Sequence, residues 1–246
     1  MYRNVRSYDL KYTDVDAYDN IKLSSLLSFL EESACLSAAE LGFGYDDLMP
    51  KNLGFILVNV FIKLERNIHL NDKLTIHTWP LKPSFAIFLR DSELYVGNEK
   101  VGVATARWCM IDTSSFSVRP SSAFFKPEDF DNYNTERSVN FSDWKIPAQE
   151  SGKKVCSHRV AFSDYDHYFH VNNTRYADFC MDVFSVDELK DKALSSVQIS
   201  YVKQCKENEI IDFYRVETAD GFTVIEGRVD GELRSITVKP SAVSTR

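Results

Sequence analysis

The sequence has 246 residues, of which 44% are hydrophobic and 13% aromatic, and it carries a formal net charge of −7 at pH 7. This length and composition are typical of a globular protein with one large or two ordinary domains and a sizeable buried core. The acidic balance, without a Lys/Arg tract or nucleic-acid-binding motif, argues against a nucleic-acid partner. No apolar run approaches the roughly 20 residues that span a bilayer, and no signal-peptide core follows the N-terminus, so we expect a cytoplasmic protein without a membrane span.

The cysteines point to neither a disulfide framework nor a metal site. There are five of them, an odd number, and no two are spaced as Cys-x-x-Cys. We therefore expect free thiols and no bound metal.

The first half of the chain begins with a predicted strand over residues 3–12, followed by a helix over residues 22–41. Apolar side chains follow one face of this helix: Leu23, Leu26, Leu27, Leu30, Ala34 and Ala38. Gly42 is a suitable helix stop. Residues 54–112 are rich in β-branched and aromatic types and are broken at three turn sequences, which predicts about four strands.

A polar stretch over residues 113–153, rich in Ser, Pro, Asn and charge, separates this unit from a second one with the same order of elements. The second unit has a predicted strand over 154–162, a helix over 174–189 and strands that begin near residues 195, 210, 222 and 232. Asp220-Gly221 and Asp230-Gly231 are typical of the tight turns that join antiparallel strands.

Both units write Asp-x-Asp-x-Tyr directly before their helix, as TDVDAY from Thr13 and as SDYDHY from Ser163. Because this match occupies the same place in the same order of elements, we interpret the chain as an internal duplication. The two copies end differently: the first continues with Asn20, and the second with His170 followed by Val-Asn-Asn.

The second copy resembles the signature of the acyl-acyl carrier protein (acyl-ACP) thioesterases, Ser-Asp-x-Asp-x-Asn-x-His-Val-Asn-Asn, with Tyr168 in place of an Asn. A further segment, Tyr201-Val-Lys-Gln204-Cys205, resembles the family's Tyr-x-x-Glu-Cys in the strand after the helix, with Gln204 in place of Glu. The resemblance implies an α+β protein with a tandem (double) hotdog fold, in which two antiparallel sheets each wrap a long central helix.

The resemblance implies that Asp166 is the catalytic carboxylate, acting as a general base or as a nucleophile. His170 is expected to hydrogen-bond the thioester carbonyl or the water and to protonate the leaving thiolate. Asn172 or Asn173 is a suitable cap for the second helix, whose free N–H groups can face the thioester oxygen. This chemistry requires no metal and no organic cofactor.

Three further residues of the motif carry open alternatives. Tyr168 either replaces the polar contact of the family's Asn or packs in the core. Gln204 can orient a water molecule but cannot take its proton, which moves the burden of base catalysis to Asp166. Cys205 is either a nucleophile beside His170 or, as is usual for a neutral Cys in a strand, a small buried hydrophobe.

By analogy with the family, we expect residues 1–125 to form an N-terminal hotdog that holds the acyl chain, 126–153 a linker, and 154–246 a C-terminal hotdog with the catalytic motif. The expected acyl tunnel is lined partly by apolar residues of the first helix: Leu26, Leu27, Phe29, Leu30 and Leu36. For any one of them, however, ordinary core packing is the more usual role.

The leading hypothesis is an acyl-ACP thioesterase that releases a free fatty acid, acting as a monomer or a homodimer. Its acidic carrier protein would need a basic cluster beside the tunnel mouth, drawn from Arg3, Arg6, Lys11, Arg175, Lys203 or Lys206. An acyl-CoA thioesterase on the same fold is the second hypothesis. A lipid-binding protein whose catalysis has decayed is the third, motivated by Tyr168 and Gln204.

Overall fold

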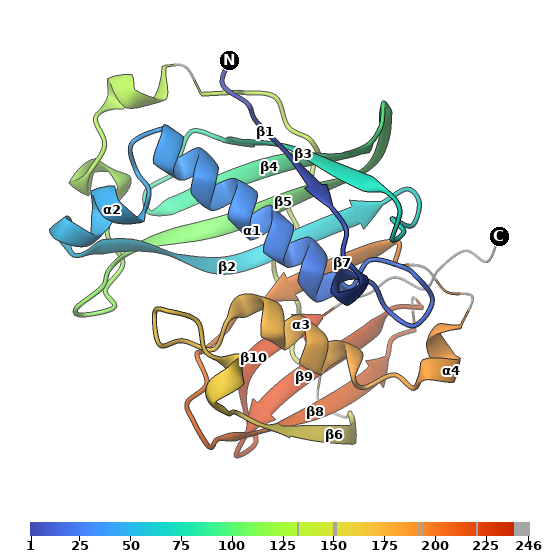
Figure 1. Cartoon of the computed structure of the whole chain (residues 1–246). Coiled ribbons are helices and arrows are strands. Elements are labelled where there is room, and N and C mark those ends of the chain that lie inside the picture. Colours follow the sequence, from blue (N-terminus) through green and yellow to red (C-terminus); the bar gives the residue numbers. More distant parts are fainter. Residues whose placement is uncertain (132, 150–151, 191, 193, 220, 239–246) are drawn as a thin grey trace.

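The computed structural model describes residues 1–131, 133–149, 152–190, 192, 194–219 and 221–238. Ten strands form a single sheet in the order β1-β3-β4-β5-β2-β7-β10-β9-β8-β6, and every paired neighbour is antiparallel (Figure 1). The first five are β1 (Asn4–Asp9), β2 (Leu53–Leu64), β3 (Lys73–Pro80), β4 (Ile87–Val96) and β5 (Glu99–Asp112). The second five are β6 (Lys153–Arg159), β7 (Ser196–Ser200), β8 (Ile210–Glu217), β9 (Thr223–Val229) and β10 (Glu232–Val238).

The two halves of the sheet have the same strand order, counted from each outer edge toward the centre. The first half runs β1-β3-β4-β5-β2, and the second half has the same order of corresponding strands when it is followed from its own edge strand, β6. The halves join where β2 pairs with β7, with Asn59 opposite Ser200. Each half is thus one hotdog-like unit, and their sheets are continuous through the central pair.

Helix α1 (Leu23–Glu40) crosses the first half of the sheet and ends as predicted at Gly42. Gly42 has a φ of +77°, and its N–H donates to the carbonyl of Ala39. The next N–H, from Phe43, donates to the carbonyl of Ala38, which completes the double hydrogen bond of a Schellman motif.

The second helix is shorter than predicted. In place of one helix over 174–189, the chain forms α3 (Asn173–Met181) and a separate turn of helix, α4 (Val186–Leu189). Ser185 caps α4 in a capping box with Glu188, and Glu188 also pairs with Arg215 of β8 at 2.7 Å. These contacts stabilise a new helix start, so the prediction of a long central helix in the second half is wrong.

The strand predictions agree with the structure except at some ends. The four strands between residues 54 and 112 are confirmed, and the β9–β10 turn has positive φ at both Asp230 and Gly231. The Asp220 position lies outside the described residues. Strands β1 and β6 end about three residues early, because Tyr12–Asp14 and Phe162–Asp164 each form a 3-10 turn.

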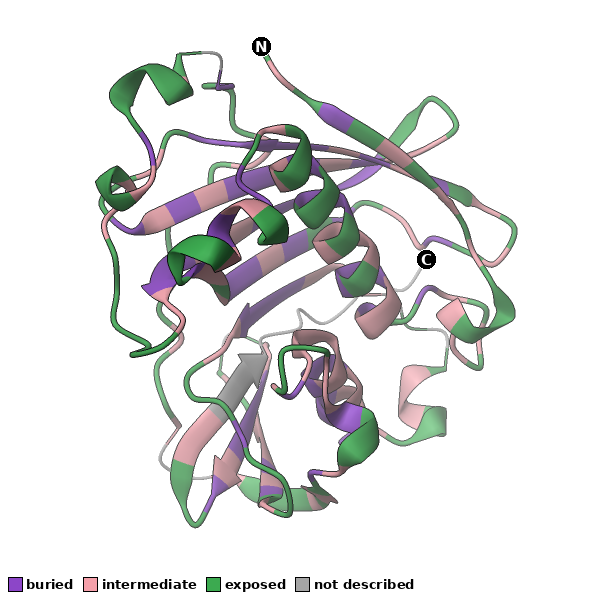
Figure 2. Cartoon of the chain, turned by 60° about the vertical axis from the view of Figure 1, so that its left-hand side comes forward, coloured by how far each residue is buried: buried purple, intermediate pink, exposed green. Residues whose placement is uncertain are grey.

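One hydrophobic core runs through both halves, on the sheet face that α1 and α3 cover, and its members include Leu26, Ile62, Ile199 and Phe213. The covered strand faces are largely buried, whereas the outer surfaces of the helices are exposed (Figure 2). Helices α1 and α3 also contact each other.

The connector after β5 is attached to the protein by two buried carboxylates on the other side of the sheet. Asp91 of β4 accepts hydrogen bonds from Arg137 at 2.9 Å and from the Ser138 N–H at 2.7 Å. Glu226, on the corresponding strand β9, accepts one from the Gln149 N–H at 2.7 Å. In its described part, residues 126–149 contain a 3-10 turn at Pro127–Phe130 and no strand. The domain boundaries expected from the sequence stay a prediction.

Candidate active site

The repeated motif forms the same loop in both halves. In the first half, Asp16 Oδ1 accepts hydrogen bonds from the N–H groups of Tyr18 (2.8 Å) and Asn20 (3.1 Å). In the second half, Asp166 Oδ1 accepts them from Tyr168 (2.8 Å) and His170 (3.1 Å). The residue before the closing position has a positive φ in both loops, 59° and 58°. The second Asp of each motif thus holds the turn closed.

The first Asp of each motif accepts a backbone hydrogen bond that holds its loop, and within the described part of the chain only the second copy, Asp164, is also ion-paired. Asp164 is buried, and its carboxylate contacts His158 Nε2 at 2.7 Å and Arg175 Nε at 3.4 Å. Burial opposes ionisation, yet the hydrogen bonds from His158 and the Ala161 N–H lower the pKa of Asp164 below its ordinary value. Asp14 keeps only the equivalent backbone bond, from the Lys11 N–H at 2.8 Å.

Each of these loops leads directly into the N-terminus of a helix, α1 or α3. Asn172 is the N-cap of α3, and its Oδ1 accepts from the Thr174 N–H at 2.8 Å and from the Thr174 hydroxyl at 2.7 Å. Among the described residues, none accepts a hydrogen bond from the N–H of Asn173, the first residue of the helix. A free N–H at a helix N-terminus is a suitable donor for a developing oxyanion.

His170 and Tyr168 face the first half of the molecule. The His170 ring lies 5.9 Å from the Phe116 ring, which belongs to the turn after β5. Tyr168 is 45% exposed, and its ring packs edge-on against Tyr45 of α2 (Tyr45–Leu48) at 5.4 Å. The core alternative for Tyr168 is therefore wrong. Burial of its hydroxyl, together with the charges near it, raises the pKa of Tyr168 to about 12.

The predicted strand over Tyr201–Cys205 is also wrong, because β7 ends at Ser200. The Tyr201 N–H still bonds the carbonyl of Val58, but the chain then turns toward α3, where the Cys205 N–H donates to the Tyr176 hydroxyl. Gln204 is exposed and donates to the carbonyl of Val171 at 3.3 Å. Cys205 is buried in the core, and this burial raises the pKa of its thiol, which favours the structural role over the nucleophilic one.

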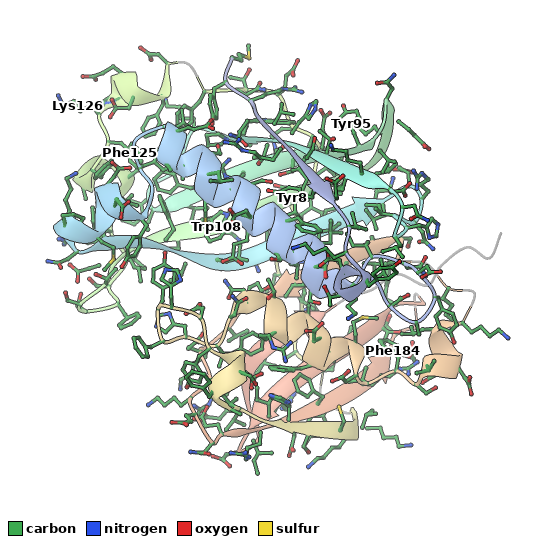
Figure 3. The ribbon with its side chains drawn as sticks, in the orientation of Figure 1. Tyr8, Tyr95, Trp108, Phe125, Lys126 and Phe184 are labelled. Carbon is green, nitrogen blue, oxygen red and sulfur yellow. The ribbon has the colours of Figure 1, made fainter. Side chains whose placement is uncertain are left out.

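A cavity lies between α1 and the first half of the sheet and reaches the first turn of α3. It encloses about 430 Å³ of space free of protein atoms, including its open part. Its walls are mostly apolar, and Trp108 of β5 lies beneath α1 (Figure 3). From the sequence-predicted set, Leu27, Leu30 and Asn173 line it. Space arises where β5 carries the small residues Ala104 and Ala106.

Three other helix residues proposed for the tunnel do not line this cavity. Leu26 is fully buried in the core, Phe29 stacks on the ring of Tyr8 at 4.6 Å, and Leu36 is 36% exposed. On a helix of 3.6 residues per turn, Phe29 and Leu36 face away from the stripe formed by Leu27, Leu30 and Ala34. Leu26 precedes Leu30 by one turn and lies at the edge of that stripe, where it packs into the core.

Two charged residues of the cavity wall were missed by the sequence analysis. Glu31 lies on α1 one turn after Leu27, and Arg90 lies on β4. Burial, with the negative charges of Asp166 and Glu32, raises the pKa of Glu31 to about 7. Burial lowers the pKa of Arg90 to about 10, and its guanidinium donates to Ser37 Oγ at 2.8 Å. The available sequence signal was a charged residue amid the apolar stripe of the helix.

The basic residues proposed for carrier docking do not gather into one cluster of free charge. Arg3 pairs with Glu93 and Glu136, and Arg6 pairs with Glu40. Arg175 pairs with Asp164 and Asp178. Lys11, Lys203 and Lys206 are exposed, and none forms an ion pair within the described part of the chain. Lys203 and Lys206 flank Gln204, beside the candidate site.

The fold defines a class: the chain is a tandem hotdog protein, with a cavity between α1 and the first half of its sheet that reaches the first turn of α3. The models of the acyl-ACP thioesterase N-terminal and C-terminal domains match residues 2–120 and 148–231, and together they cover most of the chain. The chain therefore belongs to the acyl-ACP thioesterase family. None of the described helices is long and apolar enough to cross a membrane.

Individual relatives are distant in sequence and close in fold. A chloroplastic palmitoyl-acyl carrier protein thioesterase of Gossypium hirsutum is 22% identical over 220 residues, which is 84% of this chain but only 53% of that protein. The chain thus spans about half the length of this relative. A crystal structure of an acyl-ACP thioesterase from Bacteroides thetaiotaomicron has a TM-score of 0.87 with 19% identity, covering 97% of each chain. The 12:0-ACP thioesterase from Umbellularia californica has a TM-score of 0.81 with 12% identity, covering 97% of this chain and 96% of that one.

Proposed function

We propose that this protein hydrolyses the thioester of a fatty acyl chain carried by acyl carrier protein and releases the free fatty acid. The observation that carries the proposal is the cavity, which runs along apolar walls beneath α1 and ends at the N-terminus of α3. A fatty acyl chain fits apolar walls, and a thioester carbonyl at the far end would lie beside an unused helix N–H. Membership of the acyl-ACP thioesterase family supports the same reaction.

In the proposed reaction, water adds to the thioester carbonyl carbon while the Asn173 N–H stabilises the oxygen that becomes negative. The helix dipole of α3 strengthens this contact. Glu31 lines this cavity, and Asp166 lies close enough to raise its pKa, so a carboxylate is available as a proton acceptor for the water. His170, on the same loop as Asp166, is suited to protonate the departing thiolate.

The carrier protein is the proposed partner because it presents the acyl chain on a long flexible arm and is itself acidic. Lys203 and Lys206 are exposed cations beside the site, which supports docking on this side of the second half. The same arm occurs in acyl-CoA, so acyl-CoA is the competing donor. We propose that the protein acts in the cytoplasm, as a monomer or homodimer, since the two hotdog units already pair within one chain.

The test is hydrolysis of matched acyl-ACP and acyl-CoA panels by the purified protein, across several chain lengths. We expect release of free fatty acid with a higher kcat/KM for acyl-ACP. A strong preference for acyl-CoA would replace the proposed donor. No hydrolysis of either panel by folded protein would favour a lipid-binding function in place of an enzymatic one.

A further inference from the structure

Helix α1 carries two adjacent carboxylates with different surroundings. Glu32 is exposed, whereas Glu31 is largely buried and forms part of the cavity wall. Among the described residues that line the cavity, Glu31 is the only acid. It shares this wall with Asn173 and Thr174 of α3, so the helix of the first half brings a carboxylate to the helix N-terminus of the second.

The Glu31 carboxylate also has no hydrogen-bond partner within the described part of the chain. No described residue donates a hydrogen bond to either of its oxygens, and neither oxygen is among the buried polar atoms that are cut off from solvent. A structural carboxylate with this degree of burial is normally hydrogen-bonded or ion-paired. An accessible carboxylate without a partner in an apolar cavity can instead hold a water molecule.

Asp166, the carboxylate that the sequence motif indicates, has a structural role that accounts for its presence in the motif without catalysis. Its Oδ1 closes the loop by accepting from Tyr168 and His170, and Asp16 makes the same two bonds in the half that lacks the His. Asp166 is not among the residues that line the cavity. The loop therefore needs an Asp in both halves, whether or not a half performs chemistry.

We propose, on the basis of the proposed function, that Glu31 is the general base of the hydrolysis and that Asp166 is a positioning residue. The Glu31 carboxylate takes a proton from water as the water oxygen forms a bond to the thioester carbon, and the C=O π electron pair moves to the carbonyl oxygen. When the tetrahedral intermediate collapses, the C–S bond breaks and its electron pair leaves with sulfur. The sulfur then takes up a proton from His170 or from the Glu31 carboxylic acid, and proton exchange with water restores both side chains.

The charges around Glu31 suit this role. Its pKa of about 7 gives a base that is ionised and still strong near neutral pH. The titratable groups that face it are Asp166 from the second-half loop, Glu32 and Cys35 from its own helix, Tyr168 from the loop and Tyr201 after β7. These groups are neutral or anionic. Arg90 is a cation on the same cavity wall, but its guanidinium donates to Ser37 Oγ, and among the described residues it forms no ion pair with Glu31.

A difference between the two copies of the duplication accounts for a single catalytic site with a Glu31 carboxylate. The two motifs are offset by 150 residues, from Asp16 to Asp166, and the same offset from Glu31 leads to Met181, the last residue of α3. Met181 cannot accept a proton from water. The helix N-terminus of the first half consequently has no carboxylate facing it from the corresponding place.

The test compares Glu31→Gln, Glu31→Asp and Asp166→Asn with the control Glu32→Gln, whose side chain is exposed on the same helix. For Glu31→Gln we expect kcat on acyl-ACP to fall by about 10²–10³-fold with little change in KM. The wild-type pH profile of kcat/KM should rise through about pH 7, and this limb should be absent from Glu31→Gln. Glu31→Asp should retain partial activity, and Glu32→Gln should stay within about twofold of wild type, since its carboxylate does not reach the cavity.

The proposal is overturned if Glu31→Gln keeps a kcat within a few-fold of wild type, or keeps the limb near pH 7. It is also overturned if Asp166→Asn removes that limb while Glu31→Gln does not. Inactive wild-type protein would instead refute the proposed function, and with it the role of Glu31. Circular dichroism of each variant at the assay pH separates a lost base from a lost fold.

Discussion

The loops before α1 and α3 have the same backbone and different surroundings. Both are closed by an Asp that accepts two N–H groups, and both return to their helix through a backbone bond to the preceding Asp, at 2.9 Å from Lys22 and 2.8 Å from Asn172. The second loop adds a His, and among the residues that the structure describes it alone has its first Asp ion-paired. The lesson is that the repeated Asp residues serve the fold, and that chemical difference arises from what lies around them.

The largest expected effect comes from giving the second loop the ending of the first. His170→Asn should lower kcat for acyl-ACP at least about 100-fold, because the imidazole is the proposed proton donor to the thiolate. The melting temperature should change little, since the His170 backbone N–H, not its side chain, closes the loop. Steady-state kinetics and thermal unfolding measure both quantities.

The reciprocal change, Asn20→His, is the matched control. It should create no second active site, because Met181, which cannot accept a proton from water, occupies the position in the second half that corresponds to Glu31. We therefore expect kcat to remain within about twofold of wild type. A His170→Asn enzyme with more than a third of wild-type activity would contradict the role of His170.

Asp164 and Asp14, the first Asp residues of the two motifs, should contribute differently to the stability of the protein. Asp164→Ala removes a buried carboxylate, leaves His158 without its carboxylate partner and leaves Arg175 paired with Asp178 alone. We therefore expect a loss of about 2–3 kcal/mol in the free energy of unfolding. Asp14→Ala removes only the hydrogen bond from the Lys11 N–H, which resembles a helix-capping bond, and should lower the free energy of unfolding by about 1 kcal/mol. Urea unfolding followed by circular dichroism gives both values. Equal losses would mean that the ion pairs around Asp164 add nothing.

Glu31 should make the stability of the first half depend on pH. Its folded pKa of about 7 lies above the ordinary value of 4.5, so the folded protein binds more protons than the unfolded chain between these values. Wild-type stability should therefore fall as pH rises from about 4.5 to 7, and Glu31→Gln should remove this fall.

The size of this effect follows from about 1.4 kcal/mol for each pKa unit, which gives an advantage of about 1–3 kcal/mol for Glu31→Gln at pH 8 that is absent near pH 4.5. Urea unfolding at several pH values checks it without any substrate. Glu32→Gln is again the control and should show no such trend. A constant difference between Glu31→Gln and wild type across pH would contradict the raised pKa.

The smallest expected effect concerns the exposed lysines. Lys203→Glu with Lys206→Glu should raise KM for acyl-ACP by about 3–10-fold at low salt, and less at high salt, because surface charges act through screened long-range attraction. Lys11→Glu, in the first loop, should leave KM unchanged if docking occurs beside the second. A similar increase from Lys11→Glu would extend the docking surface to both halves.

Much of the fold was predictable because its signals are local. Strand alternation, the Gly42 stop and the Asp230-Gly231 turn each depend on a few neighbouring residues, and all appear in the structure. The break after Met181 was missed because a capping box at Ser185 competes with the apolar period, with support from the distant Arg215. After Tyr201 the chain leaves the sheet, and the Cys205 N–H bonds the hydroxyl of Tyr176, which is likewise distant in the chain.

The candidate site was only partly predictable for the same reason. The motif named Asp166, His170 and Asn172, because the loop and the cap are written in consecutive residues. Which side chains face the cavity depends on the packing of α1 against the sheet and against α3, so Leu26 and Leu30 could not be distinguished from the sequence.

By itself, the sequence determined that two similar units follow one another, that each opens with an Asp-closed loop and a helix, and that only one copy ends in His170. These are consequences of short-range patterns and of the duplication. Tertiary structure alone decided that Glu31 of the first unit lies on the same cavity wall as the helix start of the second. The physical reason is the pairing of β2 with β7, which joins the sheets and brings α1 against α3.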